Sequence, residues 1–356
     1  MEIEEKLRLI KEVGEEIISE DELKQLLLEK EHPIAYDGFE PSGRIHIAQG
    51  LLRAINVNKL TKTGIKFKFW VADWFALMNN KMGGDLDKIQ TVGKYFIEVW
   101  KACGMDLDNV EFLWASENMG QEYWLNVIRI GTLNTVTRIT RCSQIMGRKE
   151  GDSLSAAQIF YPCMQANDIF HLNVDIAQLG MDQRKVNVLA REIAPKIGRK
   201  KPIAIHHHML MSLKPPQTDL SGADAAIAKK MSKSDPNSAV FMTDTFDEIK
   251  KKFNKAFCPE GQVNDNPILE YCKYIIFEKV DNFLIERPEK FGGNVEFSNY
   301  VELEKAFLNK EIHPMDLKNS AAKYIDQLLE PVRKYFEKNK NAKDLLKKVE
   351  SYQITR

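Results

Sequence analysis

The sequence predicts an α/β protein in which a doubly wound parallel sheet is followed by a smaller α-helical domain. Short apolar segments typical of strands alternate with amphipathic helices as far as about residue 240. This alternation indicates a parallel sheet with right-handed crossovers, in which ligands bind beyond the carboxyl ends of the strands. After Thr243 the strand signals fade and helical patterns dominate.

The alternating region contains five predicted strands, each a short apolar run bounded by turn residues. We place them at 34–36, 67–73, 110–114, 174–179 and 203–206. Helices are expected at 45–60, from a cap at Asp85 to a stop at Gly104, and near 121–130, 155–171 and 182–196. Residues 3–29 carry apolar side chains at helical spacing, Ile17 and Ile18 among them, and predict two helices divided near Ser19–Asp21.

These elements divide the chain into three predicted parts. An N-terminal helical segment covers residues 1–30, an α/β domain covers 31–240, and a helical domain covers 241–356. Residues from about 115 to 150 interrupt the alternation, so we expect them to project from the sheet.

The composition excludes several classes of protein. Lys+Arg and Asp+Glu both total 51, so the overall charge does not point to a nucleic-acid partner. The 5 cysteines show no CxxC spacing, which indicates reduced thiols and neither a disulfide framework nor a metal site. The charged start lacks a signal-peptide pattern, and no segment approaches the roughly 18 apolar residues of a membrane helix. We therefore expect a soluble, cytoplasmic protein without membrane contact.

The strongest chemical signal is the run Lys-Met-Ser-Lys-Ser at residues 230–234. Two ammonium groups three residues apart, flanked by hydroxyls, can stabilise the charge that develops on a triphosphate as pyrophosphate leaves. A lone pair of lysines at this spacing is usually a solvated basic loop, but the complete run is much rarer.

A second signal follows the first predicted strand, in the segment Gly43–Gly50. A helix N-terminus after a glycine loop attracts anions through its free N–H groups and its dipole. His46 in this segment can donate a hydrogen bond toward an α-phosphate. Alone the segment is weak evidence, because a single histidine in a loop is more often structural.

Together the two segments resemble the signatures of the class I aminoacyl-tRNA synthetases, in the order that family shows. The resemblance implies a Rossmann-like catalytic domain, with ATP as a substrate, Mg²⁺ on its phosphates and no metal held by the protein. It implies catalytic roles for His46, Lys230 and Lys233, and ATP contacts from Met231, Ser232 and Ser234. Gln49 stands where the family's second histidine would be; it can donate a hydrogen bond but carries no charge, so its role stays open.

The amino acid is indicated by a helix that carries Tyr161, Gln165 and Asp168 on one face. An exposed polar face is the plain alternative. The run 161–168 and the following 180–185 resemble the tyrosyl-tRNA synthetases of the archaeal and eukaryotic type. The resemblance implies that Tyr36 and Asp168 bind the substrate phenol, and that further residues bind the rest of the adenylate: Tyr161, Gln165 and Gln183 the amino acid, and Gly38, Gly180 and Asp182 the nucleotide.

The same resemblance implies contacts with tRNA(Tyr). Arg141 and Arg184 are expected at the acceptor end, and Phe291, His313 and Asp316 at the anticodon. The plain alternatives are solvated arginines, a buried Phe291 and an N-cap role for Asp316. The 115–150 segment is expected to form the interface of a homodimer.

The predicted function is therefore that of a tyrosine–tRNA ligase, which makes tyrosyl-adenylate and pyrophosphate from L-tyrosine and ATP and then charges the 3′ end of tRNA(Tyr). Three alternatives remain. Tryptophanyl-tRNA synthetases share the lysine run, although Asp168 with Tyr36 favours a phenol. A non-catalytic relative acting as a binding protein has no need to keep His46, Lys230 and Lys233. A small-molecule nucleotidyltransferase would not need the elements at Phe291 and Asp316.

Overall fold

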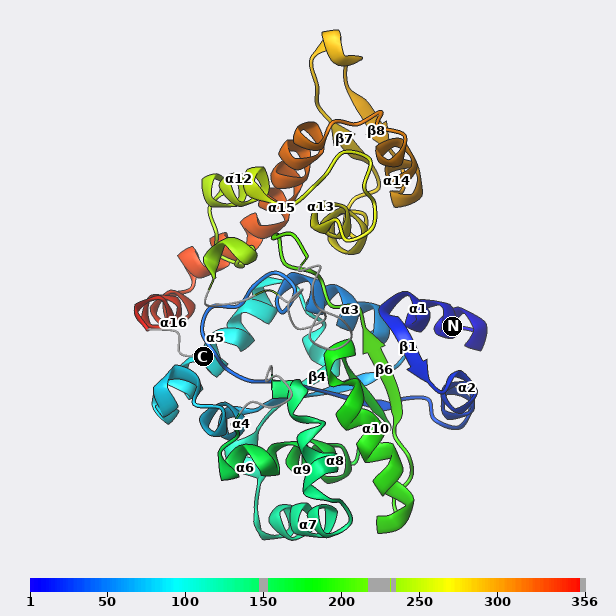
Figure 1. Cartoon of the computed structure of the whole chain (residues 1–356), viewed down its shortest axis with the longest axis vertical. Helices are drawn as coiled ribbons and strands as arrows, with labels where there is room; N and C mark the ends of the chain where they lie inside the picture. Colours follow the sequence, from blue (N-terminus) through cyan, green and yellow to red (C-terminus); the bar gives the residue numbers. More distant parts are fainter. Residues whose placement is uncertain (147–152, 217–230, 232–234, 353–356) are drawn as a thin grey trace.

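The computed structural model of this chain describes residues 1–146, 153–216, 231 and 235–352. A sheet covered by helices forms one half of the molecule, and a mainly helical part stands on it (Figure 1). The chain passes from one half to the other just before α12 (Phe246–Lys255).

Six strands form the main sheet in the order β1-β6-β5-β2-β3-β4. Their bounds are β1 (Gly14–Ile18), β2 (Ile34–Phe39), β3 (Lys66–Val71), β4 (Val110–Trp114), β5 (Ile176–Gly180) and β6 (Ile203–His207). Strands β2 to β6 are parallel to one another, as predicted, and the α/β fold class is confirmed. The chain builds outward from β2 through β3 to β4, then returns to β5 and β6. The strand order therefore reverses between β2 and β5, where sheets of this kind bind ligands.

Strand β1 is a correction to the predicted N-terminal helices. The first helix, α1 (Ile3–Val13), ends early, and Gly14–Ile18 pairs antiparallel with β6. Ile17 lies opposite Ile205 and Ile18 opposite Ala204. Continued as a helix, these residues would leave the edge of β6 without backbone partners, and their β-branched side chains suit a strand. Helical spacing alone could not reveal this pairing.

Helices pack around the sheet in the first half (Figure 1), and the described residues include ten of them. After α1 they are α2 (Glu20–Glu29), α3 (Leu51–Thr61), α4 (Asp73–Met78), α5 (Leu86–Ala102), α6 (Ala115–Asn118), α7 (Gln121–Thr132), α8 (Val136–Thr140), α9 (Ala156–His171) and α10 (Arg184–Ile193). The predicted ends of α5 are confirmed: the Asp85 side chain accepts a hydrogen bond from Lys88 N, and Gly104 has φ +69°.

The helix predicted from residue 45 begins later than expected, at Leu51. Residues 45–47 instead pair with a distant extended segment. Ile47 N donates to the carbonyl oxygen of Val240 at 2.8 Å, and Met242 N donates to that of Ile45 at 3.1 Å. This long-range pairing takes the backbone groups that a helix would have used.

The two faces of the sheet lie in two hydrophobic clusters. Phe67 and Phe69 of β3 point into the larger cluster with α3 and α5, whereas Trp70 points into the other. Tyr36 of β2 shares that second cluster with α7 and α9. Side chains alternate between the faces of a strand, so β2 delivers Tyr36 to the α9 side.

The second half contains α12, α13 (Pro267–Tyr271), α14 (Tyr300–Leu308), α15 (Pro314–Lys338) and α16 (Lys340–Ser351). It also contains a two-stranded antiparallel sheet, β7 (Phe283–Ile285) and β8 (Val295–Phe297), which was not predicted because three-residue strands carry too little pattern. Helix α16 returns to pack on α5, and the larger cluster extends into both halves. We propose that the α/β domain ends at residue 240 and that the helical domain begins at 241. Among the described residues, no helix has the length and apolarity needed to cross a membrane.

Candidate active site

Helix α9 places three of the predicted site residues in the interior. Tyr161, Gln165 and Asp168 are 6%, 6% and 1% exposed, so an exposed polar face is ruled out. The helix starts at Ser155, whose side chain and that of Gln158 form a reciprocal capping box. Buried polar groups need partners, and each of the three has one.

Asp168 lies between two tyrosine hydroxyls. Tyr36 from β2 donates to Oδ2 at 3.2 Å, and Tyr123 from α7 donates to Oδ1 at 2.7 Å. Burial raises the pKa of Asp168 well above its usual value, and the two hydroxyl hydrogen bonds oppose this rise. Burial, followed by the charge of Asp168, also raises the pKa of Tyr36. A carboxylate has about four acceptor positions, so Asp168 can accept a third hydroxyl.

A second chain of side chains connects α9 to the end of β5. Gln165 Nε2 donates to Gln183 Oε1 at 2.9 Å, and Gln183 Nε2 donates to Asp182 Oδ2 at 2.7 Å. Asp182 and Gln183 lie in a 3-10 turn at Met181–Gln183, directly after β5. The structure therefore brings these three predicted residues together at the carboxyl edge of the sheet.

Tyr161 is held by a residue that was not predicted. Its hydroxyl donates to Glu40 Oε1 at 2.5 Å, and Asn79 Nδ2 donates to the same oxygen at 2.6 Å. Burial, followed by the charge of Glu40, raises the pKa of Tyr161 well above its usual value. Glu40 follows β2, so it too stands at the carboxyl edge.

The glycines at 38 and 180 have close neighbours within the protein. A Cβ on Gly38 would lie 2.9 Å from the hydroxyl of Tyr36, two residues earlier on the same strand face. A Cβ on Gly180 would lie 2.5 Å from Asp182 Oδ1. Each glycine thus makes room for a side chain of the site, and approach of the nucleotide stays a prediction.

A buried ion pair lies behind Gly38. Arg53 Nε of α3 is 2.8 Å from Asp37 Oδ2, and Asp37 Oδ1 accepts a hydrogen bond from Gly38 N at 2.8 Å. Burial raises the pKa of Asp37 to about 7, although Arg53 acts in the opposite direction. Arg53 thus holds the Asp37 carboxylate, which in turn accepts the hydrogen bond from Gly38 N and fixes the backbone there.

The His46 segment pairs through its backbone with the chain that follows the lysine run. His46 forms a bridge with Phe241, in the segment that follows the lysine run. Lys230, Ser232, Lys233 and Ser234 lie outside the described residues, as do residues 217–229 before them. Met231 is half-buried and packs against the larger hydrophobic cluster. The carbonyl oxygen of Gln49 accepts a hydrogen bond from Trp100 Nε1 at 2.8 Å.

The predicted tRNA-binding residues belong to several separate elements, and only His313 and Asp316 share one, at the start of α15. Arg141 is exposed after α8, and Arg184 Nε binds the Glu16 carboxylate at 2.8 and 2.9 Å. Phe291 is 61% exposed, which rules out the buried alternative. Lys290 Nζ lies 4.9 Å from the centre of its ring.

The start of α15 corrects one alternative. Its N-cap is His313, whose Nδ1 accepts a hydrogen bond from Met315 N at 3.2 Å. Asp316 is the third residue of the helix, within its first turn, and is partly exposed, so it is not the N-cap. Pro314 fits the first helical position because its missing N–H needs no partner there.

The three consecutive histidines at the end of β6 have separate partners. His206 Nδ1 lies 2.8 Å from Glu16 Oε2, His207 Nδ1 lies 3.0 Å from Gln178 Nε2, and His208 contacts Glu15 and Glu270. In the ranges that the structure covers, no group of three or more His, Cys, Asp or Glu side chains could hold a metal ion.

Comparison with known proteins identifies the family of this chain. The profile of the tRNA synthetases class I (W and Y) matches residues 28–330. "Tyrosine--tRNA ligase 1, cytoplasmic" of Arabidopsis thaliana is 52% identical, over 100% of this chain and 90% of its own length. "Tyrosine--tRNA ligase" of Thermococcus sibiricus is 44% identical, over 100% of both chains.

Two solved structures show the same fold. Tyrosyl-tRNA synthetase of Leishmania major in complex with tyrosinol has a TM-score of 0.90 and 46% identity, over 99% of this chain and 61% of that chain. The enzyme of Pyrococcus horikoshii complexed with L-tyrosine has a TM-score of 0.89 and 40% identity, over 98% of this chain and 100% of that chain. The predicted resemblance is confirmed: this chain belongs to the class I tRNA synthetases of tryptophan and tyrosine, and within them to the tyrosyl-tRNA synthetase family.

Proposed function

We propose that the protein activates L-tyrosine with ATP and transfers the tyrosyl group to the 3′ end of tRNA(Tyr). The observation that carries this proposal is the buried Asp168 carboxylate between Tyr36 and Tyr123. A third hydroxyl donor, the substrate phenol, would occupy a further acceptor position of Asp168. Tryptophan has no hydroxyl, and the single N–H donor of its indole ring is at a different position from the phenol hydroxyl of tyrosine. Asp168 therefore favours tyrosine over tryptophan.

The rest of the pocket then orients the substrate. With the phenol at Asp168, the chain of Gln165 and Gln183 and the hydroxyl of Tyr161 stand along α9, where they can hold the α-amino and carboxylate groups. Asp182, after β5, would accept hydrogen bonds from the ribose. A substrate held at both ends has lost most of its rotational freedom before reaction, which lowers the barrier.

In the first step, a tyrosine carboxylate oxygen attacks the α-phosphorus of ATP, and the bond from this phosphorus to the bridging oxygen of pyrophosphate breaks. The carboxylate is already ionised, so no general base is required. His46, Lys230 and Lys233 would stabilise the charge on the phosphates, with Gln49, Met231, Ser232 and Ser234 lining the site. Mg²⁺ would bind the phosphate oxygens of ATP, the kind of ligand that this ion prefers at nucleotide sites.

In the second step, a terminal ribose hydroxyl of tRNA attacks the carbonyl carbon of the adenylate, and AMP leaves. Arg141 and Arg184 would contact the acceptor phosphates, Arg184 exchanging its partner Glu16 for RNA. Phe291, exposed beside two glycines of positive φ, would stack on an anticodon base, with His313 and Asp316 contacting its neighbours.

We further propose a homodimer. Five large apolar side chains are exposed on α7, α8, α9 and the loop between α7 and α8: Leu125, Ile128, Leu133, Val136 and Phe160. Exposed apolar surface gathered on one set of helices is typical of protein interfaces. This surface lies in the 115–150 segment and its neighbour α9. A cytoplasmic location is proposed from the name of the Arabidopsis relative.

Tyrosine-dependent exchange of labelled pyrophosphate into ATP tests the first step without tRNA. The proposal predicts exchange with tyrosine and none with tryptophan. Exchange driven by tryptophan would move the protein to that branch of the family. Absence of exchange with any amino acid would favour a binding protein, and transfer of AMP to another small molecule a nucleotidyltransferase.

A further inference from the structure

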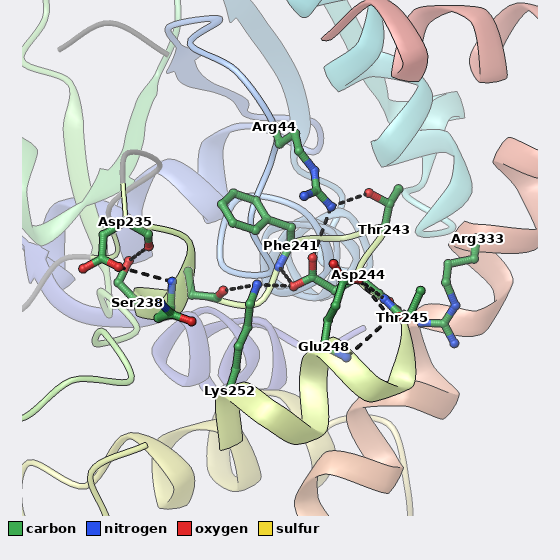
Figure 2. Close-up of polar contacts among 12 residues, drawn as sticks. Arg44, Asp235, Ser238, Phe241, Thr243, Asp244, Thr245, Glu248, Lys252 and Arg333 are labelled. Atoms are coloured by element: carbon green, nitrogen blue, oxygen red, sulfur yellow. Dashed lines mark hydrogen bonds and ion pairs between the residues drawn. The ribbon is translucent and has the colours of Figure 1, made fainter. Parts of the chain in front are cut away.

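A buried carboxylate stands where the two halves of the molecule meet. Asp244 is 1% exposed and lies between the last residues of the α/β half and α12 (Figure 2). Its Oδ1 accepts a hydrogen bond from Arg44 at 3.1 Å, and its Oδ2 accepts from Lys252 Nζ at 2.5 Å and from Phe241 N at 2.8 Å. Its side chain therefore joins one cation from each half of the molecule.

On the α/β side, these contacts reach the signature segment. Arg44 is two residues before His46, and its guanidinium lies 4.7 Å from the centre of the Phe241 ring. The backbone of 45–47 pairs with 240–242. Gly50 is pressed against the same segment, because a Cβ there would lie 2.5 Å from Met242 Sδ. The His46 turn and the strand-like segment 240–242 thus form one packed unit.

On the helical side, Asp244 is held by two helices. Lys252 belongs to α12 and also donates to the carbonyl oxygen of Ala239 at 3.0 Å. Arg333 of α15 donates to the carbonyl oxygen of Asp244 at 2.9 Å. Thr245, the next residue, caps α12 and accepts a hydrogen bond from Glu248 N (Figure 2). Asp244 is consequently fixed to the helical part through both its side chain and its backbone.

We propose that Asp244 is a positioning residue for adenylate formation. It sets the spacing between the His46 segment and residues 235–244, which follow the lysine run in the sequence. This inference rests on the proposed function. The run 230–234 ends six residues before Val240, so the anchor at 240–244 holds the described chain that follows the run. Misplacement of a reacting group by about 1 Å can cost a hundredfold in rate. The Asp244 carboxylate binds Arg44 through one oxygen and Lys252 through the other, so it is suited to hold this spacing.

The substitution Asp244→Asn tests this role. It keeps the shape of the side chain but removes the charge that Arg44 and Lys252 share, and its amide group must face one of these donors. In pyrophosphate exchange we expect kcat/KM for ATP to fall by about tenfold or more, with KM for tyrosine within about twofold of wild type. Direct tyrosine binding, measured without ATP, should be unchanged. A purely structural role would weaken tyrosine binding as well.

Glu278→Gln is a matched control. Glu278 Oε2 lies 2.6 Å from Lys59 Nζ of α3, so this ion pair also joins the two halves but touches neither the His46 turn nor 240–244. We expect its exchange kinetics to stay within about twofold of wild type. An equal loss in Glu278→Gln and Asp244→Asn would overturn the inference, because any weakening of the junction would then suffice.

Arg44→Gln provides a second route if Asp244→Asn does not fold. Arg44 is 25% exposed, so its loss is less disruptive, and the same split between ATP and tyrosine is expected. In the double variant, kcat/KM for ATP should fall by less than the product of the two single fold-losses. Both substitutions remove the same contact, between Arg44 and Asp244. Multiplicative effects, or unchanged ATP kinetics in Arg44→Gln, would contradict the inference. If wild type shows no exchange, the proposed function itself fails.

Discussion

The hydroxyl of Tyr36 donates to Oδ2 of Asp168 at 3.2 Å, and the two side chains are 1% exposed each. The two residues are 132 positions apart in the sequence and arrive from β2 and α9. A carboxylate this deeply buried is costly unless donors surround it. The protein supplies two hydroxyls, and the proposed substrate supplies a third.

Tyr123→Phe removes the shorter of the two protein hydrogen bonds to Asp168. A hydrogen bond to a buried acceptor contributes about 1 kcal/mol, so KM for tyrosine should rise roughly fivefold while KM for ATP is unchanged. Steady-state exchange kinetics measure both constants. Tyr324→Phe is the control: its hydroxyl donates to the carbonyl oxygen of Asn282 at 3.4 Å and accepts from Leu284 N at 3.0 Å, but it lies in the helical half. An unchanged KM for tyrosine in Tyr123→Phe would remove Tyr123 from the pocket.

The Asp37 carboxyl gives the stability of the protein a defined pH dependence. Its pKa rises from 3.8 to about 7 on folding, so between these values the folded state binds a proton that the unfolded state has lost. Its contribution to stability is present below 3.8 and declines as the pH rises toward 7. As the pH rises through this window, the free energy of unfolding of the wild type should fall by about 4 kcal/mol relative to that of Asp37→Asn.

Urea denaturation of both proteins at a series of pH values measures that difference. Loss of the Arg53 partner in Asp37→Asn adds an offset that does not vary with pH, so only the slope matters. A difference that grows in favour of the wild type as the pH rises would mean that Arg53 outweighs burial, and that Asp37 is ionised throughout.

Phe291→Ala tests the RNA contact in the helical half. Stacking of an aromatic side chain on a base contributes about 1–3 kcal/mol, so kcat/KM for tRNA in aminoacylation should fall about tenfold or more. Pyrophosphate exchange should be unaffected, because it needs no tRNA. Leu308→Ala is the control, since Leu308 is 58% exposed on α14, close to the 61% of Phe291. Equal effects of the two substitutions would contradict a stacking role.

Ile128→Glu tests the proposed dimer surface on α7 and its neighbours. Ile128 is 58% exposed, and a carboxylate in an apolar interface is strongly unfavourable without a partner. Sedimentation should show a dimer for the wild type and a monomer for the variant at equal concentration. Val301→Glu introduces the same charge on α14 and should stay dimeric. A monomeric wild type would refute the proposal.

Local patterns could predict much of the site, but not its long-range contacts. The spacing of Tyr161, Gln165 and Asp168 places them on one helix face, and the structure joins Gln165 to Gln183, two residues that the resemblance assigns to the same substrate. Tyr123 and Glu40 were missed because they lie in different elements from their partners, and nothing in their local sequence marks them.

The two errors in secondary structure have the same origin. The helix expected from residue 45 is delayed to Leu51 by pairing with 240–242, and the helix expected through Ile18 becomes β1 by pairing with β6. In both places a distant segment supplies backbone partners that override local propensity.

The selectivity of the pocket for a phenol is the central claim, and Asp168→Asn tests it most directly. The measurement is the ratio of kcat/KM for tyrosine to that for phenylalanine in pyrophosphate exchange. The matched control Asp73→Asn alters another buried carboxylate that accepts a serine hydroxyl, from Ser116 at 2.6 Å, outside the pocket.

An unsatisfied buried polar group costs about 1–3 kcal/mol, so in Asp168→Asn the ratio should decrease by a factor of roughly 5 to 150. It should remain at the wild-type value in Asp73→Asn. A ratio that is unchanged by Asp168→Asn would show that tyrosine is not recognised through this carboxylate.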